Sequence, residues 1–184
     1  MRTDIAWTAL PWSSVEHVTI ADEDSWTADG AMVAVFDGHA VRLTYRLQVD
    51  ATGATRALDL ADAVGGATLT LRGDGHGRWR DADGAPVPEL DDCIDVDIST
   101  TPLTNTLPVR RLRLAPGESA EIQVAYVDVP SLAVRPVAQS YRRIDERSYR
   151  YASGPFSADV VFDEHDLVTD YVGLWHRVAI DARA

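Results

Sequence analysis

The 184-residue sequence contains one cysteine, Cys93, and no lysine. A single cysteine excludes an intrachain disulfide and a zinc site built from several cysteines. No stretch reaches the roughly twenty apolar residues of a membrane-spanning helix, and residues 1–17 lack the apolar run of a secretory signal peptide. We therefore expect a cytoplasmic protein without stable membrane insertion. The excess of Ala, Arg, Asp and Val over Lys indicates a GC-rich bacterial genome.

Positive charge is also scarce. Seventeen arginines stand against 29 acidic residues, which gives a formal net charge of −12. Such a chain repels phosphate backbones and anionic lipid head groups, so nucleic acid is not an expected partner. With 46% hydrophobic and 25% charged residues, the composition is that of a globular protein. The length predicts one domain over residues 1–184.

The third thing that is missing is a helical apolar stripe. Most segments alternate with period two, as residues 40–50 do, where apolar side chains occupy every second position. Such alternation is typical of half-buried antiparallel strands. One helical turn is conceivable over residues 59–64, before Gly65 and Gly66. The prediction is an all-β, mainly antiparallel protein with few or no helices.

Two segments change phase midway. The apolar set of residues 119–129 switches near Tyr126, and that of residues 107–114 switches across Arg110 and Arg111. Because a one-residue slip moves every later side chain to the other face of a strand, both positions predict β-bulges. Bulges bend strands and suit a long, strongly curved sheet.

Residues 91–98 form an acidic strand in which Asp95 and Asp97 share one face and the isoleucines and Val96 share the other. Carboxylates at i and i+2 lie roughly 6.5–7 Å apart. This spacing overlaps that of inverting glycosidases and could seed a metal site, although the glycine and glutamate of a calcium loop are missing. The favoured interpretation is structural, with Asp95 and Asp97 paired to Arg110 and Arg111.

The arginine pair and the turn before it leave alternatives open. A guanidinium that faces a cavity can bind phosphate or carboxylate, whereas one that meets an aspartate is structural. Residues 100–108 form a turn rich in threonine that also contains Asn105 and two prolines. Its side chains can hold the loop through its own backbone, or they can meet the hydroxyl groups of a sugar.

Other motifs carry little chemistry. Residues 73–79 are glycine-rich but lack the lysine and the following helix of a phosphate loop, so they predict a hairpin that leads into Trp79. The five histidines are scattered without metal-ligand spacing, and neither a metal nor a cofactor is expected. Cys93 lies among acids that should raise the pKa of its thiol, which makes it a poor nucleophile. No catalytic residue is assigned.

Aromatic residues concentrate after the acidic strand. Aromatic bodies with polar tips suit a groove for an acyl chain or the face of a sugar, and they equally suit a β core. Together with polar candidates for a head group, the candidate ligand-binding residues are Trp79, Asn105, Arg110, Arg111, Tyr126, Gln139, Tyr141, Tyr149, Tyr151 and Trp175.

Three segments carry a resemblance to a known family: DCIDVDISTTPLTNTLPVRRL, QVAYVDVPSLAVRPVAQSYRR and YRYASGPFSADVVFDEHDLVTDYVGLWHR. Together they resemble the bacterial putative glycolipid-binding family over nearly the whole chain. The resemblance implies a curved antiparallel half-barrel of many strands, similar in shape to the periplasmic lipoprotein-carrier proteins. It also implies a glycolipid or lipid-like ligand. Val172 stands where the family usually has proline.

The leading hypothesis is a non-enzymatic binding protein that holds a glycolipid or lipid-like molecule on the concave face of the half-barrel. Arg110 or Arg111, Asn105 and Gln139 would fix its polar head. One alternative is a hydrolase or isomerase that acts on a sugar or lipid through Asp95 and Asp97. Another is a structural or dimerisation module, and homodimerisation stays open.

Overall fold

In a computed structural model, which describes residues 2–22, 25–36 and 38–183, the described residues form one open, curved sheet of fourteen strands. The strand order is β7-β6-β5-β4-β3-β2-β1-β14-β13-β12-β11-β10-β9-β8. All neighbours are antiparallel except β8 and β9. The prediction of an all-β, mainly antiparallel half-barrel is confirmed.

The strands of the first half of the chain are β1 Arg2–Ala9, β2 Ser14–Asp22, β3 Trp26–Phe36, β4 His39–Val49, β5 Thr55–Asp62, β6 Thr68–Gly73 and β7 Trp79–Arg80. The helical segments are short: the 3-10 helices η1 Pro88–Leu90 and η2 Leu103–Asn105, and the α-helix α1 Thr106–Leu112. The remaining strands are β8 Asp95–Ile98, β9 Ser119–Val127, β10 Val134–Arg143, β11 Ser148–Ser153, β12 Phe156–Phe162, β13 Val168–Tyr171 and β14 Trp175–Arg183.

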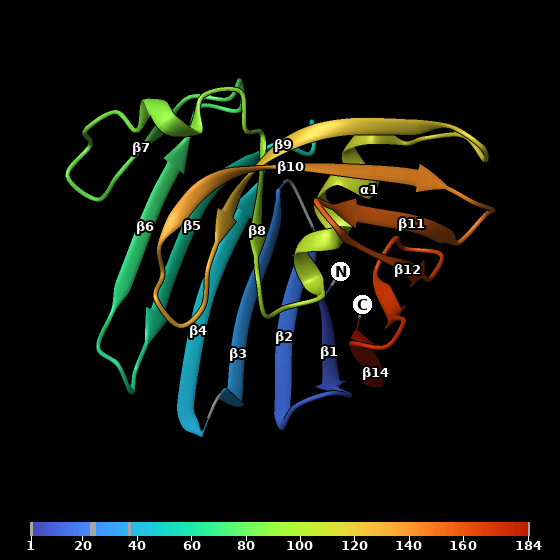
Figure 1. Cartoon of the computed structure of the whole chain (residues 1–184), viewed down its shortest axis with the longest axis horizontal. Coiled ribbons are helices and arrows are strands. Elements are labelled where there is room, and N and C mark those ends of the chain that lie inside the picture. The colour runs from blue at the N-terminus through green and yellow to red at the C-terminus, as the bar shows by residue number, and fades with distance from the viewer. Residues whose placement is uncertain (1, 23–24, 37, 184) are drawn as a thin grey trace.

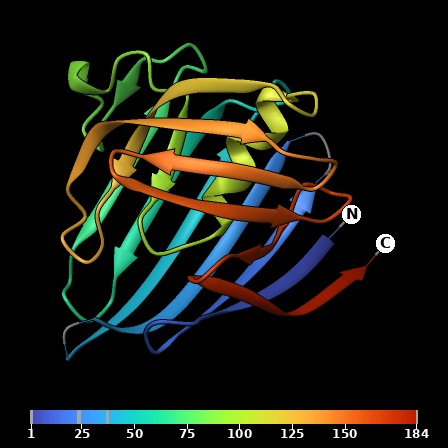
Figure 2. The same cartoon turned by 45° about the vertical axis from the view of Figure 1, so that its right-hand side comes forward.

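The sheet consists of two meanders that meet at a central seam. Strands β1–β7 follow one another in one half, and β9–β14 follow one another in the other half. The seam is the antiparallel pair of β1 and β14, in which Ile5 lies opposite Ile180. Because the sheet curves strongly, the strands of the second meander cross in front of those of the first in the view of Figure 2, and α1 lies between the two halves (Figures 1 and 2).

The helix α1 belongs to the crossover between the two parallel strands. Parallel neighbours cannot be joined by a tight hairpin and need a connection of a dozen or more residues, usually with a helix. Residues 99–118 supply that connection, and α1 ends at Arg113, whose φ of 48° is left-handed. The predicted bulge at Arg110 and Arg111 was therefore wrong, since the two arginines lie on a helix.

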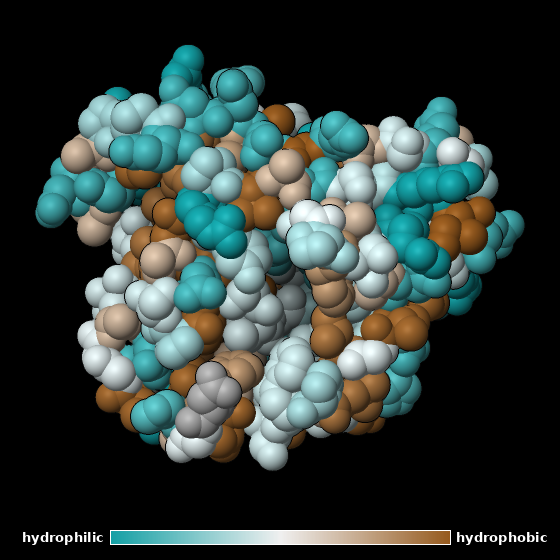
Figure 3. All heavy atoms as spheres, viewed as in Figure 1, coloured by the Kyte–Doolittle hydropathy of each residue, from teal (hydrophilic) through white to brown (hydrophobic). Residues whose placement is uncertain are grey.

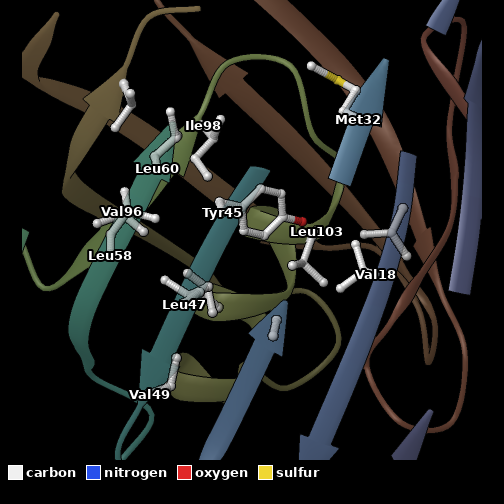
Figure 4. Close-up of a cluster of buried hydrophobic side chains, with 14 of the residues drawn as sticks. Val18, Met32, Tyr45, Leu47, Val49, Leu58, Leu60, Val96, Ile98 and Leu103 are labelled. Atoms are coloured by element: carbon white, nitrogen blue, oxygen red, sulfur yellow. The ribbon is translucent and has the colours of Figure 1, made fainter. Parts of the chain in front are cut away.

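The crossover also fills the concave face of the sheet. Residues 101–109 are all buried. Leu103 and Leu107, one helical turn apart, are 0% and 2% exposed and belong to the same apolar cluster as the inward side chains of β2–β5. Figure 4 shows Leu103 in this cluster beside Val18 and Tyr45, and Val96 beside Leu58. The concave face is thus a packed core over most of its area.

Two further local predictions were wrong. The ladders of β9 with β8 and β10 run without a register shift at Tyr126. The phase change arises because Val124 and Ala125 are both buried, as in a strand that is covered on both faces. Residues 59–62 continue β5, and a turn follows at Ala63.

Hydrophilic residues are common on the molecular surface, and in the view of Figure 3 they gather along the upper edge. On this face the hydrophobic residues form scattered groups. Among residues 2–22, 25–36 and 38–183, no helix has the length and apolar character needed to cross a membrane.

Two arginines tie α1 to the sheet in different ways. Arg111 donates to Asp95 of β8 from Nε at 3.2 Å and from Nη2 at 2.6 Å, and the Asp95 side chain is 0% exposed. Arg110 reaches the other half, where it donates to Asp22 at 2.9 Å and its guanidinium lies 5.7 Å from the Trp26 ring centroid. That pair is about one-third exposed. The helix thus bridges the two halves of the sheet.

Arg111→Met is expected to lower the free energy of unfolding by about 3–5 kcal/mol, because it leaves the buried Asp95 carboxylate without its counter-charge. Arg110→Met, the matched control, should cost no more than about 1 kcal/mol, since its pair is partly solvated. The double variant Asp95→Leu/Arg111→Met should recover most of the loss. Urea unfolding monitored by tryptophan fluorescence measures all three. Equal effects of the two single variants would contradict this account.

Candidate functional site: an aromatic pocket beside the crossover

A small pocket of about 140 Å³ lies where the start of the crossover meets the second meander. Six of its lining side chains are aromatic: Trp12, Tyr126, Tyr151, Phe156, Tyr171 and Trp175. Its polar lining comes from Asp97, Ser99, Thr101 and Asn105, and Ile98 and Leu174 complete it. The pocket therefore combines aromatic rings with a few polar groups, which is the usual composition of a ligand site.

Strand pairing brings these rings together from distant positions. Tyr171 of β13 lies opposite Trp175 of β14. Tyr151 of β11 is surrounded by other rings, with centroids 6.0 Å from Tyr171 and 6.1 Å from Phe156. Trp12, from the loop before β2, meets Trp175 edge to face at 5.6 Å. These separations are in the range of favourable aromatic pairs, so the rings support one another around the pocket.

Asp97 supplies the charge of the pocket. Its Oδ1 accepts a hydrogen bond from Thr104 Oγ1 at 2.8 Å, and its Oδ2 accepts one from Gln139 Nε2 at 2.6 Å. No arginine or histidine forms an ion pair with Asp97 in the part of the chain that the structure describes. Burial raises the pKa of the Asp97 carboxyl, and the two hydrogen bonds oppose this shift.

A second buried carboxylate lies behind the pocket. Glu16 of β2 is 0% exposed, and it accepts hydrogen bonds from Tyr45 Oη and from Thr101 Oγ1, both at 2.7 Å. Burial raises the pKa of Glu16 from 4.5 to about 7. Gly30 makes room for this network, since a Cβ there would lie 2.1 Å from the Tyr45 ring. The network fixes Thr101, and with it one wall of the pocket, against the first meander.

The phenolic hydroxyl groups of the tyrosines in and behind the pocket lie in buried surroundings. Tyr141, behind the pocket, donates to Asn105 Oδ1 at 3.1 Å and thereby orients that amide. Burial raises the pKa of Tyr151 and of Tyr171, and the negative charge of Asp97 raises both further. All of these phenols therefore stay protonated at neutral pH and are available as donors.

The structure separates the residues predicted from sequence. Asn105, Tyr126, Tyr151 and Trp175 line the pocket, while Gln139 and Tyr141 lie directly behind it. The remaining candidates are elsewhere. Trp79 donates to the carbonyl of Cys93, Tyr149 packs against Phe162 and Arg143, and Arg111 is held by Asp95.

The sequence predicted that Asp95 and Asp97 pair with Arg110 and Arg111. The structure has the Asp95–Arg111 pair, but the prediction was wrong for Asp97 and for Arg110. Asp97 bonds neutral side chains, and Arg110 pairs with Asp22 rather than with Asp97. Arg110 instead lines a larger cavity of about 280 Å³ near the end of β2. We favour the smaller pocket as the site because it concentrates aromatic rings around a carboxylate without a counter-ion, whereas the guanidinium in the larger cavity is already paired.

The candidate ligand-binding residues from sequence did not include Trp12, Phe156 and Tyr171, which line the pocket, or Glu16 behind it. Glu16 has a signal in the sequence, since it falls in phase with Val18 and Ile20 on the inward face of β2. Trp12 lies in a loop, where no periodicity exists to assign it a face.

Metal and thiol chemistry find little support. Within the described residues, no group of three or more His, Cys, Asp or Glu side chains could hold a metal ion. Cys93 is 0% exposed, and burial together with the neighbouring aspartates raises the pKa of its thiol to about 11. That shift agrees with the expectation of a poor nucleophile.

The fold and the site define a β half-barrel with an aromatic, acidic pocket beside its crossover helix. The chain belongs to the family described as putative glycolipid-binding, whose model matches residues 4–177. It is similar to a crystal structure of a DUF1089 family protein from Pseudomonas aeruginosa, with 38% identity and a TM-score of 0.83. That match covers 92% of this chain and 94% of the other.

A beta-barrel-like protein of the domain of unknown function DUF1849 from Brucella abortus shares the fold at 10% identity, with a TM-score of 0.59. The match covers 100% of this chain and 98% of that protein. No curated protein matches the chain.

Glu16→Gln is expected to change how stability depends on pH. Because the folded-state pKa of Glu16 lies above its usual value, protonation favours the fold: this contribution is complete below pH 4.5 and is lost as the pH rises to about 7. At about 1.4 kcal/mol per pKa unit, the loss is about 3 kcal/mol. A glutamine resembles the protonated acid, so Glu16→Gln should keep this stability at pH 8.

Urea unfolding at several pH values measures the difference between Glu16→Gln and the unmodified chain. That difference should grow between pH 4.5 and pH 7 and then stay constant. Glu121→Gln, on the exposed face of β9, is the matched control and should show no such growth. A flat difference for Glu16→Gln would refute the buried-carboxyl interpretation.

Proposed function

We propose that this protein is a non-enzymatic binding protein for a glycolipid or another lipid-like molecule, and that the aromatic pocket holds the head group of the ligand. The observation that carries the proposal is the six aromatic side chains gathered around Asp97. Aromatic rings offer apolar area for a sugar face or an alkylated head group, and the neighbouring polar atoms fix its orientation.

The size of the pocket supports a head group rather than a whole lipid. Pockets for drug-sized ligands measure about 300–1,000 Å³, whereas this pocket measures about 140 Å³. The concave face is filled by the crossover, so the acyl part would lie at the pocket mouth and not along the sheet. The lining residue Phe156 is 41% exposed, and Val172, which follows the lining residue Tyr171 in sequence, is 57% exposed.

Further apolar surface adjoins the pocket on the side of β1. Leu10 is 60% exposed, and its backbone N–H bonds the carbonyl of Leu174, which lines the pocket. Exposed apolar side chains around a pocket mouth are typical of sites that meet an apolar partner. A lipid-like ligand would cover them.

The enzymatic alternative lacks its second carboxylate. Asp97 lines the pocket, but Asp95 lies against Arg111 and is not among the lining residues. A mechanism with two carboxylates, one as acid and one as base, needs both at the reacting bond. Binding is therefore the better supported function.

Protein purified without detergent and extracted with organic solvent should yield a bound lipid by mass spectrometry. Phe156→Ala, which removes a half-exposed ring at the pocket mouth, should lower the retained lipid and weaken rebinding by roughly tenfold, equivalent to about 1.4 kcal/mol. Val33→Ala is the matched control, because Val33 is 62% exposed on β3 and lies outside the pocket.

Two results would oppose the proposal. One is the absence of extractable lipid together with no rise in melting temperature when lipid extracts are added. The other is an equal loss of binding in Phe156→Ala and Val33→Ala, which would place the ligand outside the pocket.

A further inference from the structure

The charge balance of the aromatic pocket is incomplete. A carboxylate offers about four acceptor positions, and the Asp97 carboxylate receives one neutral donor at each oxygen, from Thr104 and Gln139. Neither donor carries positive charge. Of the three aspartates that are buried in the described chain, Asp95 pairs with Arg111 and Asp163 pairs with Arg177 at 2.5 Å, whereas Asp62 accepts hydrogen bonds from backbone N–H groups. Asp97 is thus a half-buried carboxylate without an ion-pair partner among the described residues.

The surroundings of Asp97 make the pocket electrically negative. Burial is the largest cause that raises the pKa of Tyr126, Tyr151 and Tyr171, and the Asp97 charge raises all three further, although for Tyr171 the interaction with Tyr151 is larger than that with Asp97. The guanidinium of Arg135 lies 5.0 Å from the centroid of the Tyr126 ring. The Tyr126 ring therefore already forms a cation–π contact with a positively charged side chain of the protein.

Aromatic rings around a carboxylate match one ligand chemistry better than others. Organic ammonium groups bind over aromatic rings within about 6 Å of the centroid, and quaternary ammonium ligands are recognised by aromatic cages. A neutral sugar would stack on the same rings and donate to Asp97, but it would leave the half-buried charge without a counter-ion. An ammonium group satisfies the rings and the carboxylate together.

We propose that the aromatic pocket selects a ligand whose head group carries an organic ammonium, with Asp97 as its counter-ion and Tyr151, Tyr171 and Trp175 as its cage. This proposal rests on the function proposed above and names the class of head group. The ammonium could belong to an amino sugar, as in a glycolipid, or to a quaternary amine, as in a lipid of the choline type.

Pairs of isosteric probes test the charge requirement directly. Choline and 3,3-dimethyl-1-butanol have nearly the same shape but differ in charge, and glucosamine and glucose form the corresponding pair for sugars. We expect the charged member of at least one pair to bind at least tenfold more tightly, by NMR titration or calorimetry. The pair that shows the preference identifies the source of the ammonium.

Asp97→Asn keeps the size and one acceptor of the side chain while it removes the charge. It should abolish the preference for the charged probe, so that the two members of the pair bind with affinities that are equal within about twofold. Asp170→Asn is the matched control, because Asp170 is next to Tyr171 in sequence, pairs with His176 at 2.6 Å and lies outside the pocket lining. It removes the same charge and should keep the preference.

Three results would overturn the inference: equal affinity for both members of each pair, a preference that survives in Asp97→Asn, or no binding of any probe at the solubility limit. The comparison of probes on the unmodified protein needs no variant, so it decides the matter even if Asp97→Asn fails to fold. Lipid retention that depends on Phe156 would still support the proposed function in each of these cases. Failure of the charge preference and failure of lipid binding are thus distinguishable.

Discussion

An open, strongly curved sheet exposes an apolar concave face, and that face must be covered from within the chain. Here the cover is the crossover between β8 and β9, in which residues 101–109 are all buried. Its apolar side chains join the core of both meanders, and Arg110 and Arg111 attach it to opposite halves. The curvature of the sheet, the position of α1 and the shape of the site all depend on this one insertion.

The same insertion explains why the site is small and lies to one side. A crossover that fills the concavity leaves no trough along the sheet for a long ligand. What remains is the space beside its first turn, where Thr101 and Asn105 face the aromatic residues of β11–β14. The polar groups that hold the crossover in place are therefore also the groups that a ligand would meet. Under the proposed function, the same crossover segment has both a structural role and a binding role.

Much of the fold could be predicted from sequence, because half-buried antiparallel strands alternate visibly, as β4 does over its whole length. The crossover could not. With seven residues, a proline at position 108 and β-branched Thr106 and Val109, α1 has little intrinsic helical signal, and its conformation comes from tertiary packing.

Contacts between residues that are distant in the sequence could not be predicted either. The sequence predicted that Arg110 and Arg111 pair with Asp95 and Asp97 without assigning which arginine meets which aspartate, and the structure pairs Arg111 with Asp95. The partner of Arg110 is Asp22, which is 88 residues distant and is brought close only by the closure of the two meanders. Three of the six aromatic residues of the pocket, Tyr126, Tyr151 and Trp175, were among the candidates from sequence. The contribution of Glu16 through Thr101 depends on a contact between residues 85 positions apart.

The ladder between β1 and β14 differs from the other ladders in the entropy that is lost when it forms. Most ladders of the two meanders join neighbours in sequence, so each closes a short loop. The seam joins Arg2 to Arg183 and encloses almost the whole chain. Loop-closure entropy grows with the logarithm of loop length, which makes the seam the ladder with the largest entropic cost. The two meanders are thus joined along one edge by the β1–β14 ladder, and the ion pairs of Arg110 and Arg111 connect them a second time through α1.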